Sequence, residues 1–372
     1  MRLFEPVEFR ARVEPDRLAL VMPGGGHETM SYGEFAAFVR KTAHAIVAEA
    51  DVRGRRVAAC LDDDTTLAAV ACALPQLGST DVLVCPRGHS GPVSADIVIS
   101  DRTLPVAPHA TLVKLRSDEL KQGPDQAAAL APAGGGDTSF SFLQSLQTGA
   151  AVIYTLSSNA RQDRILQRMM LGSVAGIGRV LLAADIRQER GLSALFECLW
   201  SGGAVILSGE RVENDLQPAG LYGASGLFLS SSWAPSYLAI LGKKVNFAAS
   251  LRSVTVAGAG FTRDMVDRIK RHLSNNVALH LDRHEIGTYA VCPHRNVDRA
   301  PIFRTAPGAE IRIVSEGYEQ VPPRTLGALA IRSDFALQAE SAGVTGKAMF
   351  RDGWFLPGIS AATVAEDAFV LR

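Results

Sequence analysis

Side chains that could bind a metal or act as acids and bases gather near residue 285 of this chain of 372 residues. They are His280, Asp282, His284, Glu285, Cys292 and His294. Imidazole, thiolate and carboxylate groups are the zinc ligands of proteins. On a strand that runs into a loop, however, His280 and His284 do not converge as they would on a helix. A site built from the two histidines is therefore not favoured, and Glu285 is kept as the single metal-binding candidate.

Two other patterns that could do chemistry are incomplete. Ser230, Ser231 and Ser232 lack the G-x-S-x-G sequence that exposes the nucleophile of a hydrolase. Gly176 and Gly178 precede a predicted strand, whereas the glycines of a dinucleotide-binding motif follow one. Neither a serine hydrolase nor a dinucleotide-dependent enzyme is favoured.

The elements that must position Glu285 lie between Leu251 and Leu281. Hydrophobic periodicity predicts a buried strand at residues 252–256, an amphipathic helix at 262–273 capped by Thr262, and a second strand at 276–281. A strand, helix and strand of this length form a parallel crossover unit, which binds ligands at the carboxyl ends of its strands.

Gly258 and Ala259, in the small-residue turn after the first strand, and Glu285 fall at those strand ends. Small residues let a planar ring or a phosphate approach the backbone, and a carboxylate can hold a cation. An ordinary crossover with a tight corner explains the same pattern without any ligand.

The rest of the chain alternates helices and strands. Ser31 and Glu34 form a capping box that opens a helix to Glu49. Further helices are predicted at residues 65–77, 158–171, 192–200 and 233–241, and strands at 56–61, 80–85, 96–99, 139–143, 150–156, 179–182, 204–207 and 227–229. Ile165, Leu166 and Met169 are expected to form the buried face of the helix at 158–171.

This pattern predicts the α/β fold class, with two wound αβαβ subdomains plus a small C-terminal β subdomain. The Ala-, Gly- and Pro-rich tract at residues 121–136 has no periodicity and is interpreted as a linker. The expected domain limits are 1–125 for the first αβ subdomain, 137–300 for the second αβ subdomain and 301–372 for the β subdomain.

Composition narrows the function classes. The chain carries 38 basic and 38 acidic residues, so bulk charge favours neither nucleic acid nor a membrane surface as a partner. No apolar run is long enough to span a bilayer and the N-terminus has no signal-peptide core, which favours a cytoplasmic protein. The five cysteines contain no CxxC pair and fall in apolar patterns, so buried thiols are expected and disulfides are not.

Several segments, in their order along the chain, resemble one protein family. They are Glu14–Leu20, Met30–Phe35, Ser250–Val254 with Ala257–Ala259, Pro307–Val314 and Asp352–Phe355. Together they resemble the large N-terminal domain of the adenylate-forming enzymes, which include acyl- and aryl-CoA synthetases, peptide-synthetase adenylation domains and luciferases. The resemblance implies the fold of that domain, and an ATP-dependent carboxylate ligase that uses ATP, AMP and magnesium.

The family's phosphate loop is altered in this sequence. The resemblance aligns that loop, which ends in G-x-P-K, with residues 142–152 and implies phosphate contacts from Ser145, Thr148 and Gly149. A loop glycine is replaced by Leu146 and the lysine by Val152. Because such a loop offers backbone N–H groups, hydroxyls and a cation to the triphosphate, tight phosphate binding is not expected.

Two further motifs of the family are altered. Its Y-G-x-T-E motif, which implies contact with adenine and magnesium, aligns with Leu281–Glu285 and retains only Glu285. Its T-G-D motif, whose aspartate accepts hydrogen bonds from the ribose, aligns with Pro357–Ile359, and isoleucine accepts none. The chain ends at Arg372, where the family reaches the hinge before its mobile C-terminal domain, so that domain is expected to be absent.

The resemblance also places an acyl or aryl pocket near Phe228, Trp233, Tyr237 and Phe261. Ordinary core packing explains each of these residues equally well.

Two functions remain open from the sequence. The first is an AMP-binding, acyl-CoA synthetase-like pseudoenzyme, impaired in adenylation or devoid of it, that keeps a cleft for a carboxylic acid, an acyl group or a protein partner. The second is a working acyl- or aryl-CoA ligase completed by a separately encoded C-terminal domain. A homo-oligomer is compatible with either function.

Overall fold

The computed structural model describes residues 3–22, 28–122, 137–145, 151–172, 178–208, 218–241, 250–294, 301–337 and 349–372. The chain divides into two compact units. The first unit comprises Met1–Ile165 and Asp185–Leu207, and the second unit comprises Leu166–Ala184 and Ser208–Arg372. Most of the predicted linker, residues 123–136, lies outside the described residues.

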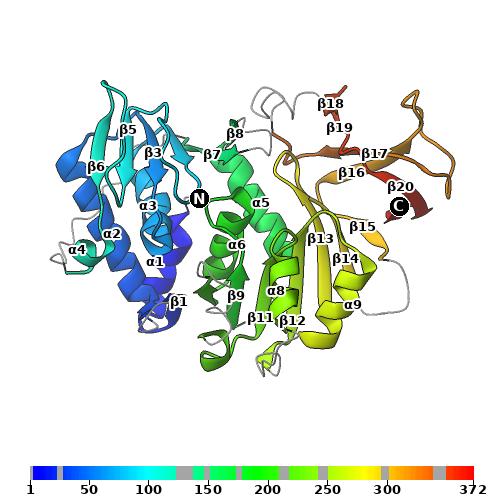
Figure 1. Ribbon diagram of the computed structural model, residues 1–372, viewed down its shortest axis with the longest axis horizontal. Helices are drawn as coiled ribbons and strands as arrows, with labels where there is room; N and C mark the ends of the chain where they lie inside the picture. Colours follow the sequence, from blue (N-terminus) through cyan, green and yellow to red (C-terminus); the bar gives the residue numbers. More distant parts are fainter. Residues whose placement is uncertain are drawn as a thin grey trace. The chain divides into compact units, whose positions relative to one another are not determined.

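A wound sheet forms the core of the first unit (Figure 1). Its strand order is β6-β5-β3-β4-β7-β8, in which only β8 is antiparallel to its neighbour. The strands are β3 (Arg56–Cys60), β4 (Asp81–Val84), β5 (Ile97–Ser100), β6 (Thr111–Lys114), β7 (Ser139–Ser145) and β8 (Ala151–Leu156). Parallel neighbours align the carboxyl ends of β3, β4 and β5 along one edge of the sheet.

Helices and a second group of strands complete the first unit. The helices are α1 (Phe4–Val13), α2 (Tyr32–Glu49), α3 (Asp64–Leu77), α4 (Ser117–Gln122) and α6 (Glu189–Trp200), and the strands are β1 (Leu18–Met22), β2 (Glu28–Ser31) and β10 (Ala204–Leu207). The predicted capping box is confirmed, because Ser31 accepts from the Glu34 amide and Glu34 accepts from the Ser31 amide. Strand β1 pairs in parallel with β10 and antiparallel with β2.

In the second unit the predicted crossover is confirmed. Strands β9 (Arg179–Ala183), β11 (Gly226–Ser230), β12 (Ser253–Gly258) and β13 (Val277–Arg283) are parallel in the order β9-β11-β12-β13. Helices α8 (Ala234–Leu241) and α9 (Arg263–His272) contact each other beside them. Thr262 caps α9 by accepting a hydrogen bond from the Met265 amide, as the sequence predicts.

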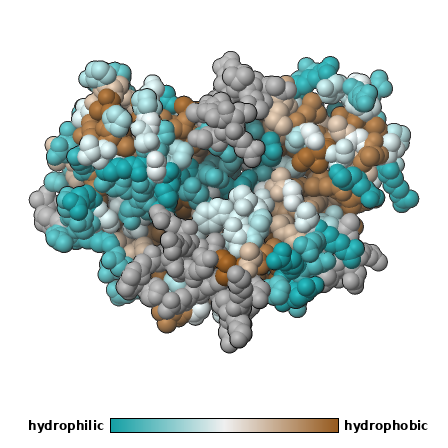
Figure 2. Space-filling view, viewed as in Figure 1, coloured by the Kyte–Doolittle hydropathy of each residue, from teal (hydrophilic) through white to brown (hydrophobic). Residues whose placement is uncertain are grey.

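Antiparallel strands extend the same sheet toward the C-terminus. In order along the sheet they are β14 (Gly287–His294), β15 (Phe303–Thr305), β21 (Ala368–Leu371), β20 (Ser360–Ala365), β17 (Gly327–Ser333), β19 (Trp354–Phe355) and β18 (Phe350–Arg351), and β16 (Ala309–Val314) pairs with β17. Exposed apolar residues of this part include Ile302, Leu326 and Val364. Brown, apolar atoms show there on the right of Figure 2.

These units do not follow the predicted domain limits. Residues 137–165 and 185–207 belong to the first unit, because β7 pairs with β4 and β10 pairs with β1. Residues 301–372 belong to the second unit, because β15 pairs with β14 and with β21. Pairings between strands so far apart in sequence leave no local signal, and the three predicted subdomains remain a hypothesis about the chain's independent parts.

The buried face of α5 (Ser158–Met170) differs from the predicted one. Ile165 is buried, but Leu166 is 38% exposed. Arg161, Arg164 and Arg168, spaced like one helical face, are at most 2% exposed. The apolar periodicity was misleading here because guanidinium groups with aromatic or acidic neighbours take the inner positions.

All five cysteines are buried, as predicted, and all are free thiols. Within the described ranges, no helix is long and apolar enough to cross a membrane.

Candidate functional site

The small-residue turn and the carboxylate lie at adjacent strand ends, as the crossover predicts. Gly258 is the last residue of β12 and is the register partner of Leu281 on β13, four residues before Glu285. Positions at the ends of two neighbouring parallel strands share one edge of the sheet.

A serine hydroxyl occupies the space next to Gly258, where a ligand could otherwise approach the backbone of the turn. A Cβ atom at Gly258 would lie 2.1 Å from Ser231 Oγ, and the φ angle of Gly258 is 141°, so only glycine fits. The Ser231 amide donates to the Ala257 carbonyl oxygen (2.9 Å), and the Ala259 amide donates to Ser231 Oγ (3.3 Å). These bonds tie the loop after β11 to the turn after β12.

Glu285 has a counter-ion within its own segment. Its side chain is 7% exposed and its carboxylate lies 3.5 Å from Arg283 Nε. Its backbone carbonyl accepts a hydrogen bond from the Leu337 amide (2.7 Å), which fixes the hairpin between β13 and β14. In the described ranges, no three His, Cys, Asp or Glu side chains are arranged to hold a metal ion.

Asp282 carries a second buried carboxylate beside Glu285. The β13–β14 pairing shifts register between Leu281 and Asp282, and Thr288 Oγ1 donates to Asp282 Oδ2 (3.0 Å). Arg168 Nη1 of α5 lies 3.6 Å from the same oxygen, with both side chains at most 3% exposed. The Arg168 guanidinium also lies over the Phe228 ring, 4.8 Å from its centroid. Arg168, Asp282, Thr288 and Phe228 thus form one buried polar cluster.

His280 and Gln167 border this buried polar cluster. Burial, reinforced by Arg168, lowers the pKa of His280 to about 3, so the imidazole is neutral at pH 7. Its Nδ1 atom has no hydrogen-bond partner among the residues that the structure describes. Gln167 Nε2 donates to the carbonyl oxygens of Thr288 (3.0 Å) and Pro307 (2.6 Å), while its Oε1 has no donor in the described part of the chain. Two buried polar atoms are therefore available to a water molecule or a ligand.

The predicted aromatic pocket residues have separate environments. Phe228 is fully buried beneath Arg168, and Tyr237 is fully buried with its hydroxyl 3.5 Å from Ser208 Oγ. Trp233 is half-buried at the start of α8. Phe261 is half-buried and stacks on the buried Phe303 of β15, with ring centroids 6.2 Å apart.

The altered phosphate-loop positions lie mostly outside the described residues. Ser145 ends β7, where its backbone pairs with Ala151 of β8, and this hairpin belongs to the first unit. Leu146, Thr148 and Gly149 lie in the undescribed interval. In the second unit Ile359 is half-buried, and its carbonyl oxygen accepts from the Leu329 amide (2.8 Å).

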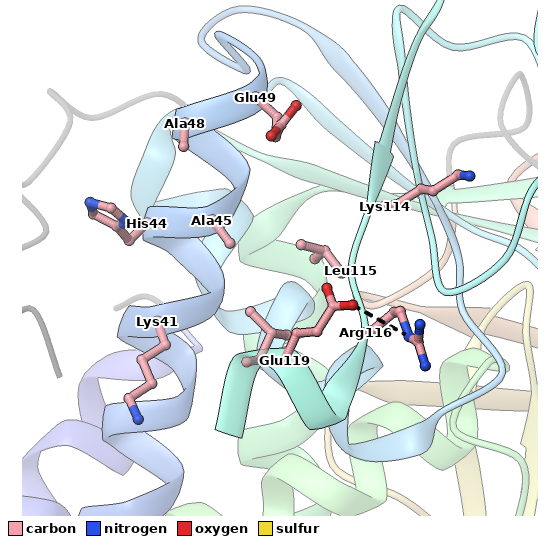
Figure 3. A pocket seen from close by; sticks show the side chains of 10 residues that line it. Lys41, His44, Ala45, Ala48, Glu49, Lys114, Leu115, Arg116 and Glu119 are labelled. Carbon is pink, nitrogen blue, oxygen red and sulfur yellow. Dashed lines mark ion pairs between the residues drawn. The ribbon is translucent and has the colours of Figure 1, made fainter. Parts of the chain in front are cut away.

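A hollow of about 320 Å³ in the first unit is a poor active-site candidate (Figure 3). Ala45 of α2 and Leu115 after β6 face each other across it, whereas the charged end of Lys41 and the ring of His44 point away. Arg116 is neutralised by Glu119 at 3.6 Å, and both side chains are more than 60% exposed. The polar groups that line this hollow do not converge on one point.

Sequence reasoning missed Arg168, Gln167 and Thr288. The arginine spacing along α5 was the available signal, since positions 161, 164 and 168 share one helical face. Strand β14, which supplies Thr288, was also missed: the chain turns at residues 284–286 and pairs back on β13.

No protein-family model and no curated protein sequence matches the chain. Solved structures do match it, at low sequence identity. The o-succinylbenzoate CoA synthetase MenE from Bacillus subtilis, in complex with the acyl-adenylate intermediate OSB-AMP, has 17% identity and a TM-score of 0.78, with 99% of this chain and 98% of that chain covered.

Two further matches have the same architecture. The NpsA N-terminal subdomain from Klebsiella oxytoca, in complex with 3-hydroxybenzoyl-AMSN, has 16% identity and a TM-score of 0.78 over 99% of this chain and 98% of that chain. ATP-bound MatB from Rhodopseudomonas palustris has 18% identity and a TM-score of 0.76 over 98% of this chain and 78% of that chain.

Proposed function

Because the chain has the fold of the large N-terminal domain of adenylate-forming enzymes, we propose that it is a relative of acyl- and aryl-CoA synthetases that is impaired in adenylation or devoid of it. In this proposal the chain still binds a carboxylic acid, an acyl group or a protein partner. The observation that carries the proposal is the Asp282 carboxylate, which stands at the glycine position of the family's Y-G-x-T-E motif.

A buried carboxylate changes what this position can bind. Glycine presents only backbone to a ligand, whereas Asp282 presents a carboxylate held by Arg168 and Thr288. Two like charges about 4 Å apart repel by about 4 kcal/mol at an effective dielectric constant near 20. Arg168 offsets part of that repulsion, but the Asp282 side chain still fills space that glycine leaves open. A nucleotide phosphate next to Asp282 is therefore disfavoured.

Glu285 and Ser231 also disfavour nucleotide binding. Glu285, the one retained residue of the motif, is already paired with Arg283, which competes with a magnesium ion for the carboxylate. The Ser231 hydroxyl fills the space beside Gly258 that an adenine ring would need if it approached from that side. Both features weaken nucleotide binding without disturbing the fold.

The direct test combines binding and activity on the purified chain. We expect no carboxylate-dependent pyrophosphate exchange above background, and no heat of binding for ATP with magnesium or for AMP in titration calorimetry. Exchange well above background in the unmodified protein would refute the proposal.

A variant tests the role given to Asp282. Asp282→Gly restores the family residue and should increase AMP affinity relative to the parent. Asp352→Gly is the matched control, because Asp352 is exposed and has a positive φ angle of 50° that glycine adopts without strain. If Asp282→Gly folds but binds AMP no better than the control, Asp282 is not the reason for impaired binding.

The second candidate function is a working ligase completed by a separate chain. It is favoured by the NpsA match, because an N-terminal subdomain of similar extent has been solved in complex with 3-hydroxybenzoyl-AMSN. Under this alternative, adding a separately encoded C-terminal domain should switch on acid-dependent pyrophosphate exchange, and the chain alone should bind an acyl-adenylate analogue. If the chain binds the acyl-adenylate analogue but no mixture with a C-terminal domain shows pyrophosphate exchange, the result would support the first proposal, a chain that binds a ligand without adenylating it.

A further inference from the structure

Two thiols meet at the carboxyl edge of the first unit's sheet. Cys60 is the last residue of β3, and Cys85 directly follows the adjacent strand β4. The register pairs Ala59 with Val84, and the Cys85 amide donates to the Ala59 carbonyl oxygen (3.0 Å). The two Sγ atoms lie 2.9 Å apart and are hydrogen-bonded.

The backbone already satisfies the geometry of a disulfide. Neighbouring strands lie about 4.8 Å apart, within the Cα separation of roughly 4.4–6.8 Å that a disulfide tolerates. Sulfur atoms in a disulfide are about 2.0 Å apart, so side-chain rotations that bring the two Sγ atoms roughly 1 Å closer are sufficient. Forming the bond therefore requires no change in strand pairing.

Cys60 differs electrostatically from three of the other cysteines. The hydrogen bond with Cys85 lowers the pKa of the Cys60 thiol, and Arg102 reinforces the effect. Burial raises the pKa values of the Cys72, Cys198 and Cys292 thiols. Because the thiolate is the reactive form, Cys60 is the thiol of this group best suited to attack an oxidant.

The layer that covers the two sulfur atoms includes irregular segments. The two sulfur atoms belong to an apolar cluster that includes Leu83, Val93 and Leu104. Val93 and Leu104 lie in the segments 85–96 and 101–110, which contain neither helix nor strand. Segments with few backbone hydrogen bonds need less free energy to open locally than the core of a sheet does. A molecule as small as a peroxide can reach the sulfur atoms through such an opening.

We propose that Cys60 and Cys85 form a reversible redox couple that responds to peroxide. The Cys60 thiolate attacks one oxygen of hydrogen peroxide, forming a sulfenic acid and releasing hydroxide, which takes up a proton to become water. The Cys85 sulfur then attacks the Cys60 sulfur, forming the S–S bond and releasing a second water molecule. Two thiols and one peroxide thus become one disulfide and two waters, and an added dithiol reverses the change.

The bond would link the two strand ends next to an existing ion pair. Asp64 at the start of α3 and Arg87, two residues after Cys85, already connect these ends at 2.9 Å. The disulfide encloses α3 within a covalent loop and restricts the unfolded chain. The oxidised protein should therefore unfold at a higher temperature than the reduced protein.

The test maps the bond on the full chain. The folded protein is treated with hydrogen peroxide, its remaining thiols are blocked, and it is cut before aspartate residues. This cleavage separates Cys60, Cys72 and Cys85 into the peptides 51–61, 64–80 and 81–95. We expect two of the five thiols to disappear, peptides 51–61 and 81–95 to be joined, and dithiothreitol to separate them.

Two variants sharpen this test. Cys60→Ala should lose the cross-link and the rise in unfolding temperature, whereas the control Cys198→Ala, which removes a buried thiol of α6, should keep both. The proposal is overturned if the unmodified folded protein keeps all its thiols or if a cross-link involves Cys72. Mapping of the unmodified protein decides the matter even if Cys60→Ala does not fold.

Discussion

Two buried arginines, one in each unit, differ in how their guanidinium groups are bonded to the surrounding residues. Arg187 of the first unit donates to Asp64 (2.6 Å), Asp185 (3.2 Å) and the carbonyl oxygens of Leu61 (2.9 Å) and Asp62 (2.6 Å). Arg168 of the second unit lies 3.6 Å from its carboxylate and over an aromatic ring. In its neighbours His280 and Gln167, the atoms Nδ1 and Oε1 have no hydrogen-bond partner within the described ranges.

This difference distinguishes a buried polar network that only stabilises the fold from one that can also bind a ligand. Around Arg187 each guanidinium nitrogen has a partner, so that network holds the first unit together and leaves nothing for a ligand. Around Arg168 the burial is equally complete, but hydrogen-bonding capacity remains. Buried polar atoms without a hydrogen bond are costly to the fold, and they indicate where water or a ligand can be held.

The largest expected effect comes from removing Arg187. Arg187→Met removes the buried cation from Asp64 and Asp185 and the donor from two carbonyl groups, and should lower the free energy of unfolding by about 3–5 kcal/mol. Urea denaturation measures the loss. Arg116→Met is the control, because Arg116 is 61% exposed and should change stability by less than about 0.5 kcal/mol. A loss below about 1 kcal/mol for Arg187→Met would mean that its network contributes little.

Removing Arg168 should have a smaller effect, which a second change reverses. Arg168→Met should cost about 2–3 kcal/mol because it leaves Asp282 buried without its counter-ion. The double variant Arg168→Met with Asp282→Leu replaces the ion pair by apolar side chains and should recover most of that loss. A double-mutant cycle by urea denaturation tests the coupling, and strictly additive losses would contradict it.

His280 predicts an acid-sensitive second unit. Its pKa is about 6.5 in an unfolded chain and about 3 in the fold, so at intermediate pH the unfolded state binds the extra proton. Stability from this group is complete above pH 6.5 and falls by about 1.4 kcal/mol per pH unit toward pH 3.

Stability measured against pH tests this contribution. Between pH 6.5 and 5 the parent should lose about 2 kcal/mol more than His280→Leu. The control His44→Leu removes an exposed histidine of α2 and should follow the parent. Parallel curves for the parent and His280→Leu would show that His280 is already charged or never buried.

The smallest effect on stability is expected at the turn. Ala259 is half-buried, so Ala259→Trp should change the free energy of unfolding by about 1 kcal/mol or less. If the turn borders a ligand, aryl or fatty acids that raise the melting temperature of the parent should not raise that of Ala259→Trp. The control Ala259→Ser should respond like the parent. No response in the parent, or an equal response in the tryptophan variant, favours a scaffold without a ligand slot.

Local signals in the sequence determined what could be predicted. Thr262 and the Ser31–Glu34 box predict helix starts because a cap needs only neighbouring residues. The parallel crossover follows from one strand, one helix and the next strand. The helix α1 was missed, because its mixed polar and apolar residues give only a weak helical pattern.

Non-local pairings could not be predicted in the same way. Nothing near β7 indicates that it pairs with β4, and the buried face of α5 depends on distant acidic and aromatic partners. The candidate site was predicted in part: Gly258 and Glu285 lie at adjacent strand ends as expected. Arg168 of the buried polar cluster was not predicted, because a buried arginine becomes plausible only once Asp282 and Phe228 are known to be beside it.

The pairing of β1 with β10 has a consequence for synthesis on the ribosome. Leu20 and Val21 of β1 pair with Val205 and Ile206 of β10, about 180 residues later. At roughly 5–20 residues per second, the ribosome needs roughly 10–40 s to supply that partner. During this interval β2 covers one side of β1, while the other side exposes an apolar strand edge. The nascent first unit therefore keeps this strand edge unpaired until β10 emerges.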